Sequence, residues 1–178
     1  MAEHRLSLAI NGRERLLERR LVPFSPPDGQ PATGNGRARL GSVAVVGLGY
    51  VGLPTALALL GRSSQITGLD VSDDRLRAIE SGNVDLSDLD RARLAMARED
   101  ESFRLTSDSA VLAEADGVIV CVPTPVDAQH VPDLFALRSA CQTIVAHAHP
   151  GQTIILTSTS FVGTTRQLLV EPLHHRGL

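Results

Sequence analysis

The sequence predicts an α/β fold, a doubly wound parallel sheet with helices on both faces. Short apolar runs alternate with amphipathic stretches from Leu40 onward. One of these runs, residues 117–122, is continuously apolar, which is typical of a strand buried on both faces of a parallel sheet. Residues 47–52 place three glycines between the first apolar run and a helix-prone stretch. Together these observations indicate strand–loop–helix units repeated along the chain.

Composition and charge restrict the class of protein. The 178 residues are 43% hydrophobic and 21% charged, with a formal net charge of −3, which suits one α/β domain with an aliphatic core. The acidic balance argues against nucleic-acid binding. The two cysteines, Cys121 and Cys141, have no partner at metal-ligand spacing, and no apolar run is long enough to span a bilayer. We therefore expect a cytoplasmic protein without a metal site or membrane contact.

Residues 1–40 are expected to form a flexible extension that ends in a linker. Residues 13–21 can form a short charged helix, whereas residues 22–39 are rich in Pro and Gly and can neither continue a helix nor join a central strand. A basic arm that contacts a membrane or an acidic partner is the alternative to a mobile extension. The folded domain is accordingly placed at residues 41–178.

The elements of this domain follow in order from Leu40. Apolar runs rich in β-branched residues predict strands at 42–46, 65–70, 103–106, 117–122 and 152–156. Amphipathic spacing predicts helices at about 51–62, 73–81, 88–98, 109–114, 133–147 and 165–171. Short polar side chains are expected to cap three of these helices: Ser72 or Asp73, Ser87 or Asp88, and Asp108. Gly82 is expected to end the second helix.

The glycine loop predicts a ligand as well as a fold. Its sequence is Gly47-Leu48-Gly49-Tyr50-Val51-Gly52. Gly47 permits a tight turn, Gly49 lets a pyrophosphate approach the backbone, and Gly52 lets the helix pack closely on the strand. Three glycines at this spacing also occur in purely structural turns, so the loop gains its meaning from the next strand.

That strand ends at Asp70, eighteen positions after Gly52. A dinucleotide fold places there the carboxylate that binds the adenosine ribose hydroxyls. The alternative is a helix cap, for which Ser72 and Asp73 are better placed. A carboxylate at this position repels a 2′-phosphate, and no Arg follows at once to accept one. The sequence therefore predicts NAD rather than NADP as the cofactor.

Two further strand ends are candidates for the cofactor site, because ligands of open parallel sheets bind beyond the carboxyl ends of the strands. The residues at these ends are Val122, Pro123, Thr124 and Pro125 after the fourth strand, and Ser158 and Thr159 after the fifth. The two prolines stiffen the loop and lower the cost of ordering it around a nucleotide. The alternatives are a rigid strand exit that serves packing alone and hydroxyls that bond to local backbone.

Taken together, these motifs resemble the N-terminal NAD-binding domain of the UDP-glucose/GDP-mannose dehydrogenase family. The resemblance covers about residues 41–178 and is carried by Gly47-Leu48-Gly49-Tyr50-Val51-Gly52-Leu53-Pro54, Asp70 with Arg75, Cys121-Val122-Pro123-Thr124-Pro125, Pro132-Asp133-Leu134, and Thr157-Ser158-Thr159 with Gly163-Thr164-Thr165. It implies a Rossmann-type fold in which residues 47–52 cradle the pyrophosphate and Asp70 and Arg75 hold the adenosine end. Segments 122–125 and 158–159 would flank the nicotinamide half. The alternative for Arg75 is a solvated helix residue paired with Asp73 or Asp74.

The resemblance implies an enzyme that oxidises the 6-hydroxyl of a nucleotide sugar to a carboxylate with two NAD. Members of the family use a Cys nucleophile and a Lys, which lie beyond the matched region. This sequence contains no Lys, and Cys121 is expected to be a core residue. We therefore expect no catalytic residue in this chain and no activity of the chain alone.

The same resemblance implies that a nucleotide sugar binds only with the missing C-terminal region, and it allows a homodimer of the full-length enzyme. Residues 161–165 favour the branch that oxidises UDP-N-acetyl sugars, although Thr157 stands where many relatives carry Glu. Two other functions fit the sequence: a stand-alone NAD-binding module or sensor, and a subunit completed in trans by a polypeptide that supplies the Cys and the Lys.

Overall fold

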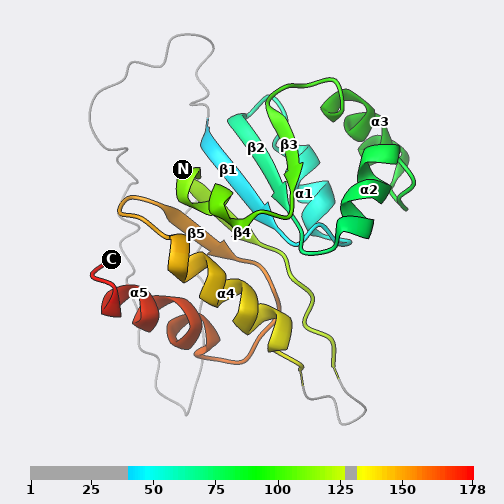
Figure 1. Cartoon of the computed structure of the whole chain (residues 1–178). Helices are drawn as coiled ribbons and strands as arrows, with labels where there is room; N and C mark the ends of the chain where they lie inside the picture. Colours follow the sequence, from blue (N-terminus) through cyan, green and yellow to red (C-terminus); the bar gives the residue numbers. More distant parts are fainter. Residues whose placement is uncertain (1–39, 127–131) are drawn as a thin grey trace, which may run out of the picture. The chain divides into compact units, whose positions relative to one another are not determined.

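The computed structural model describes residues 40–126 and 132–178, which form a parallel sheet (Figure 1). Its strands are β1 (Leu40–Val46), β2 (Ser63–Leu69), β3 (Phe103–Thr106), β4 (Gly117–Val120) and β5 (Thr153–Leu156). They lie in the order β3-β2-β1-β4-β5, so the direction of winding reverses at β1. The predicted doubly wound, Rossmann-type α/β fold is confirmed. The predicted extension and linker in residues 1–39 lie outside the described residues.

Helices cover both faces of this sheet (Figure 1). The first face carries α1 (Gly52–Ala58), α2 (Asp73–Ser81) and α3 (Asp88–Ala97), and the second carries η1 (Ser109–Glu114), α4 (Phe135–His147), η2 (Arg166–Val170) and α5 (Glu171–His175). Because side chains alternate along a strand, Val43 and Val45 of β1 point into the first core and Ala44 and Val46 into the second. Both cores are aliphatic, as the composition predicts.

The predicted capping residues hold the helix ends. The Ser72 hydroxyl accepts a hydrogen bond from the backbone N–H of Arg75 at 3.2 Å, and the Ser87 hydroxyl accepts one from Asp90 N–H at 3.2 Å. Asp108 caps η1 in the same way. α2 ends at Ser81 and is capped by Gly82, whose φ of 77° is a left-handed conformation that a residue without Cβ adopts at no steric cost.

Several bounds shift by one or two residues from the prediction, and three differences are larger. α1 ends at Ala58 rather than near residue 62, because the chain leaves the helix through turns and reaches Gly61 with a φ of 70°. Residues 109–114 form a 3₁₀-helix rather than an α-helix. The last helical segment continues past residue 171 to His175, since Pro172 lies in the first turn of α5, where its missing N–H costs no hydrogen bond.

Candidate functional site

The predicted site residues lie at the carboxyl ends of four neighbouring strands. In the sheet register Val46 is the partner of both Leu69 and Val120, and Val120 is the partner of Leu156. The segments that begin at Gly47, Asp70, Cys121 and Thr157 therefore leave the sheet at one edge. This edge flanks the reversal of strand order at β1, which is where open α/β sheets bind their ligands.

The glycine loop makes a tight turn directly after β1. Gly47 has a φ of 86°, and its N–H donates a hydrogen bond of 2.8 Å to the carbonyl oxygen of Leu69. A Cβ on Gly52 would lie 1.8 Å from the Gly47 carbonyl oxygen, so a larger residue has no room there. These two glycines are required by the path of the backbone.

Gly49 differs from both, because a Cβ on it would meet no atom within 4 Å. Within residues 40–126 and 132–178, no hydrogen bond is donated by the N–H groups of Gly49, Tyr50 or Val51. Tyr50 is 87% exposed. The loop thus combines open space at Gly49 with unpaired backbone donors, and backbone N–H groups of this kind bind phosphate oxygens. The residues present fit the pyrophosphate of a dinucleotide.

Asp70 and Arg75 both contact Leu48, in the centre of the loop. The Leu48 N–H donates to Asp70 Oδ2 at 2.7 Å, and Arg75 Nε donates to the Leu48 carbonyl oxygen at 2.8 Å. The second carboxylate oxygen of Asp70 accepts from the Ser72 N–H at 2.9 Å. The alternative pairing of Arg75 with Asp73 or Asp74 is not observed among the described residues, where Asp74 is paired with Arg77.

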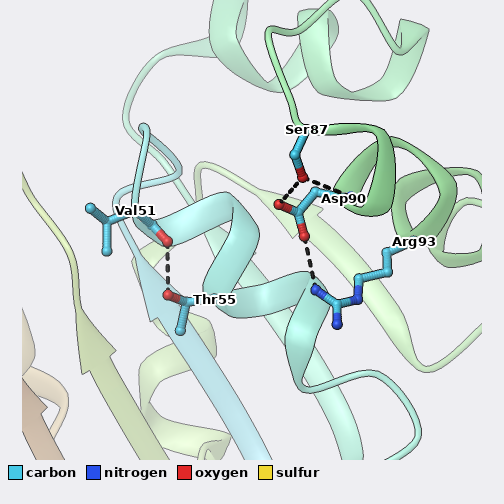
Figure 2. A network of polar contacts seen from close by, with 5 residues as sticks. All are labelled: Val51, Thr55, Ser87, Asp90 and Arg93. Atoms are coloured by element: carbon cyan, nitrogen blue, oxygen red, sulfur yellow. Dashed lines mark hydrogen bonds and ion pairs between the residues drawn. The ribbon is translucent and has the colours of Figure 1, made fainter.

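A hollow of about 360 Å³ lies beside the loop, lined by Gly49 and Tyr50, by Arg75 of α2, and by residues 85–87 before α3. Ser87 and Asp90, which line the hollow at the start of α3, belong to the network in Figure 2. There Asp90 accepts hydrogen bonds from the Ser87 hydroxyl at 2.7 Å and from Arg93 at 2.9 Å. The Ser87 hydroxyl, and then Arg93, hold the pKa of Asp90 below its usual value.

Sequence reasoning did not place residues 85–87 at the site. The signal for the network is the spacing of Ser87, Asp90 and Arg93, because residues three positions apart are neighbours at the start of a helix. No local pattern indicates that this segment faces the glycine loop. That arrangement depends on the packing of α3 against α1, which Figure 2 shows next to the Val51–Thr55 hydrogen bond.

The exits of β4 and β5 are tied together by hydroxyl groups. Ser158 Oγ donates to the Val122 carbonyl oxygen and Thr157 Oγ1 to that of Val120, each at 2.7 Å. The predicted alternative, a hydroxyl bonded to local backbone, is not what Ser158 shows, because its acceptor lies 36 positions away on the neighbouring strand exit. Because its only proton is used, Ser158 Oγ can act only as an acceptor toward a ligand.

The remaining predicted residues of these exits are open to solvent in different degrees. Thr124 is half-buried, whereas Pro123, Pro125 and Thr159 are exposed. The Pro125 carbonyl oxygen accepts a hydrogen bond of 2.7 Å from the Asp133 N–H, which fixes the point where the chain returns toward α4.

The cysteines are structural. Both Cys121 and Cys141 are buried and unpaired, and burial raises the pKa of the Cys141 thiol to about 11. Cys121 Sγ lies 3.3 Å from Thr157 Oγ1. Among the described residues no group of three or more His, Cys, Asp or Glu side chains is arranged to hold a metal ion. No helix in the same residues is long and apolar enough to cross a membrane.

A second hollow, of about 290 Å³, lies on the face of the sheet and includes Ser42 and Gln65, near the amino ends of β1 and β2. It contains none of the predicted site residues. Ligands of parallel sheets bind at the opposite, carboxyl ends of the strands. The hollow beside the glycine loop is therefore the candidate site.

The chain is similar to known proteins of one family. Residues 41–177 match the sequence model of the UDP-glucose/GDP-mannose dehydrogenase family, NAD binding domain. The UDP-N-acetyl-D-mannosamine dehydrogenase of Escherichia coli strain K12 is 35% identical over 127 residues, which cover 71% of this chain and 30% of the relative. The chain thus spans about 30% of the length of the curated relatives it matches.

Solved structures of nucleotide-sugar dehydrogenases also resemble this chain. The UDP-D-ManNAc dehydrogenase of Pyrococcus horikoshii is 30% identical, with a TM-score of 0.69, over 77% of this chain and 33% of that structure. A ternary complex of GDP-mannose dehydrogenase from Pseudomonas aeruginosa is 25% identical, with a TM-score of 0.67, over 75% of this chain and 32% of that structure. In each case the likeness covers about a third of the solved chain.

Proposed function

The chain belongs to the UDP-glucose/GDP-mannose dehydrogenase family, as its NAD-binding domain, and from this membership we propose where it holds NAD. The observation that carries the proposal is the open side of Gly49, next to unpaired backbone N–H groups. Residues 47–52 bind the pyrophosphate there, because its oxygens supply the acceptors that these donors lack. Tyr50 and Val51, exposed beside them, border the bound cofactor.

Asp70 and Arg75 bind the adenosine end. Each carboxylate oxygen of Asp70 accepts one backbone hydrogen bond, which leaves a lone pair on each oxygen for the ribose hydroxyls. The negative charge of Asp70 opposes a 2′-phosphate, so NAD is preferred over NADP. Arg75 lines the hollow beside Gly49, where its guanidinium is within reach of the adenosine.

The exits of β4 and β5 hold the nicotinamide half. The segment Val122, Pro123, Thr124 and Pro125 supplies carbonyl groups and one hydroxyl from a stiff loop. Ser158 and Thr159 supply acceptor oxygens from the neighbouring strand, and Ser158 accepts a hydrogen bond from the nicotinamide amide or its ribose. Bound NAD supplies hydride-accepting chemistry at this place, and the residues named here orient it.

The activity that follows from this domain is oxidation of the 6-hydroxyl of a nucleotide sugar to a carboxylate with two NAD. A UDP-N-acetyl sugar is the proposed substrate, because relatives named for such sugars are 32–35% identical to this chain. The absence of Lys and the burial of both cysteines support the proposal that the reacting thiol belongs to other residues than these 178. Two unpaired thiols also support a location in the reducing cytoplasm.

Titration calorimetry with NAD, NADP and a UDP-N-acetyl sugar tests the proposal. NAD is expected to bind, and NADP to bind at least about tenfold more weakly because its 2′-phosphate meets the Asp70 carboxylate. The UDP-sugar is expected not to bind to the 178 residues, and a spectrophotometric assay with NAD and UDP-sugar is expected to show no NADH. Failure of NAD to bind would refute the proposed site, and turnover would refute the assignment of the thiol.

A further inference from the structure

We propose that Asp70 and Arg75 also act as positioning residues, which clamp Leu48 and so hold the glycine loop in its binding shape before the cofactor arrives. This inference rests on the proposed function and deepens it. If Asp70 and Arg75 only contact the adenosine, their substitution weakens only the binding of the adenosine end. If they also hold Leu48 in place, their substitution weakens the binding of the pyrophosphate as well.

Leu48 is held at each of its polar groups and at its side chain. Its N–H donates to Asp70 Oδ2 at 2.7 Å, and its carbonyl oxygen accepts from Arg75 Nε at 2.8 Å. Its side chain is fully buried and lies so close to Gly68 that a Cβ there would be 2.9 Å from Leu48 Cδ1. The next residue, Gly49, is the exposed one with open space before it.

The two residues of the clamp flank the N-cap of α2: Asp70 directly follows β2, and Arg75 lies in the first turn of α2. Asp70 Oδ1 accepts from the Ser72 N–H at 2.9 Å, and the Ser72 hydroxyl caps α2 by accepting from the Arg75 N–H. The two side chains are therefore oriented by the cap of one helix. Hydrogen bonds that involve a charged group are about twice as strong as neutral ones, so the two contacts with Leu48 restrain the loop strongly.

A restrained loop favours binding because its backbone donors need not be ordered by the ligand. The N–H groups of Gly49 and Tyr50 follow Leu48 directly, and their directions are set by its backbone. Loss of the Asp70 or the Arg75 side chain is expected to let Leu48 move. The N–H groups of Gly49 and Tyr50 then no longer keep fixed directions. Affinity then falls even for a ligand that makes no contact with Asp70 through ribose hydroxyls.

The first test uses the protein without ligand. Amide hydrogen exchange of Leu48 is measured by NMR in wild type, Arg75→Met and Arg77→Met. Arg75 does not touch the Leu48 N–H, so faster exchange in Arg75→Met, by about tenfold, would show that the clamp works as a unit. Arg77→Met, which removes only the exposed pair with Asp74, is expected to match wild type. Unchanged exchange in Arg75→Met, with β1 amides unchanged in every variant, would overturn the clamp.

The second test separates the clamp from ribose binding. Affinities for NAD and for an NAD analogue that lacks the 2′- and 3′-hydroxyls of the adenosine ribose are measured in wild type, Asp70→Ala, Arg75→Met and the control Asp74→Ala. The clamp predicts that Asp70→Ala weakens binding of the analogue about fivefold or more, whereas Asp74→Ala does not. Arg75→Met is expected to weaken it too, but because Arg75 also faces the adenosine, the decision rests on Asp70→Ala. Equal affinity of wild type and Asp70→Ala for the analogue would leave only direct contact and overturn the proposal.

The two tests also distinguish this inference from the proposed function. If wild type binds neither dinucleotide, the proposed function fails, while the exchange of Leu48 in the free protein still decides the clamp. If wild type binds NAD and the exchange of Leu48 is the same in Arg75→Met, the function stands and the clamp fails.

Discussion

Gly52 and Gly47 pack so closely that a Cβ on Gly52 would lie 1.8 Å from the Gly47 carbonyl oxygen and 2.9 Å from its carbonyl carbon. The contact joins the first residue of α1 to the residue that follows β1. Both atoms on the Gly47 side belong to the backbone, which cannot rotate away as a side chain can. The loop between the two glycines therefore owes its shape to the absence of a side chain at Gly52.

Replacement of Gly52 is expected to damage the fold itself. Gly52→Ala places a methyl group inside the van der Waals radius of the Gly47 carbonyl oxygen, and relief requires movement of α1 away from β1. We expect a loss of about 2–4 kcal/mol in the free energy of unfolding, measured by urea denaturation. Gly61→Ala is a useful comparison, because its Cβ meets open space and only its positive φ opposes the change. Equal stability of Gly52→Ala and wild type would contradict the packing described here.

Replacement of Gly49 is expected to spare the fold and remove the ligand. A side chain on Gly49 enters open space, so Gly49→Val should unfold with nearly the wild-type midpoint. The same side chain fills the space from which a pyrophosphate would reach the backbone N–H groups, and NAD binding in a calorimeter should be lost. Retained affinity for NAD in a folded Gly49→Val protein would move the pyrophosphate away from this loop.

Removal of the Asp70 carboxylate is expected to weaken NAD binding. Asp70→Ala loses charge-assisted hydrogen bonds at the adenosine end, for which we expect a loss of about 1–3 kcal/mol in binding free energy by calorimetry. Asp74→Ala removes an exposed carboxylate four positions further on, in the first turn of α2, and serves as the control. An affinity of Asp70→Ala equal to that of the control would take Asp70 out of the site.

The sequence predicted most of what depends on local pattern. The glycine spacing, the polar strand ends and the caps at Ser72 and Ser87 are each set by neighbours within a few residues, so periodicity and capping rules find them. The position of Asp70 at the end of the second strand was predicted from its distance to Gly52. The length of a strand–helix–strand unit fixes where the second strand ends.

What the sequence did not predict depends on contacts between distant segments. The bond between Leu48 and Asp70 joins residues that are 22 positions apart, and its geometry requires the exact register of β1 against β2. The hollow walled by residues 85–87 requires the packing of α3. The last helical segment extends to His175, beyond the predicted residue 171, because Pro172 lies in the first turn of α5, where its missing N–H is tolerated.

The tie between the β4 and β5 exits is expected to contribute to stability and to cofactor binding. Ser158→Ala leaves the Val122 carbonyl oxygen without the hydroxyl donor that lies 2.7 Å from it, at a cost of about 1 kcal/mol in the free energy of unfolding. The β4 exit then becomes looser, and NAD affinity should fall as well. Thr159→Val, at the exposed neighbouring position, should unfold like wild type. A Ser158→Ala protein with unaltered stability would show that water replaces the hydroxyl at no cost.

Acid sensitivity is expected at the start of β1, where Asp116 Oδ2 accepts from the Ser42 N–H at 2.7 Å and from the Ser42 hydroxyl at 2.9 Å. The Ser42 N–H first, and then its hydroxyl, lower the pKa of Asp116 in the folded protein. Because the folded pKa lies below the unfolded one, this stabilisation is fully present above about pH 4 and is lost as the pH falls through the folded pKa.

Asp116→Asn removes this titration. The free energy of unfolding of wild type should therefore fall more steeply below about pH 4 than that of the variant, by less than about 1 kcal/mol because Asp116 is largely exposed and screened by solvent. Urea denaturation from pH 6 to pH 3 measures the difference, with Glu80→Gln on the exposed face of α2 as the control. If the free energy of unfolding of wild type and of Asp116→Asn changed with pH in the same way, the hydrogen bonds from Ser42 would not stabilise the charged form of Asp116.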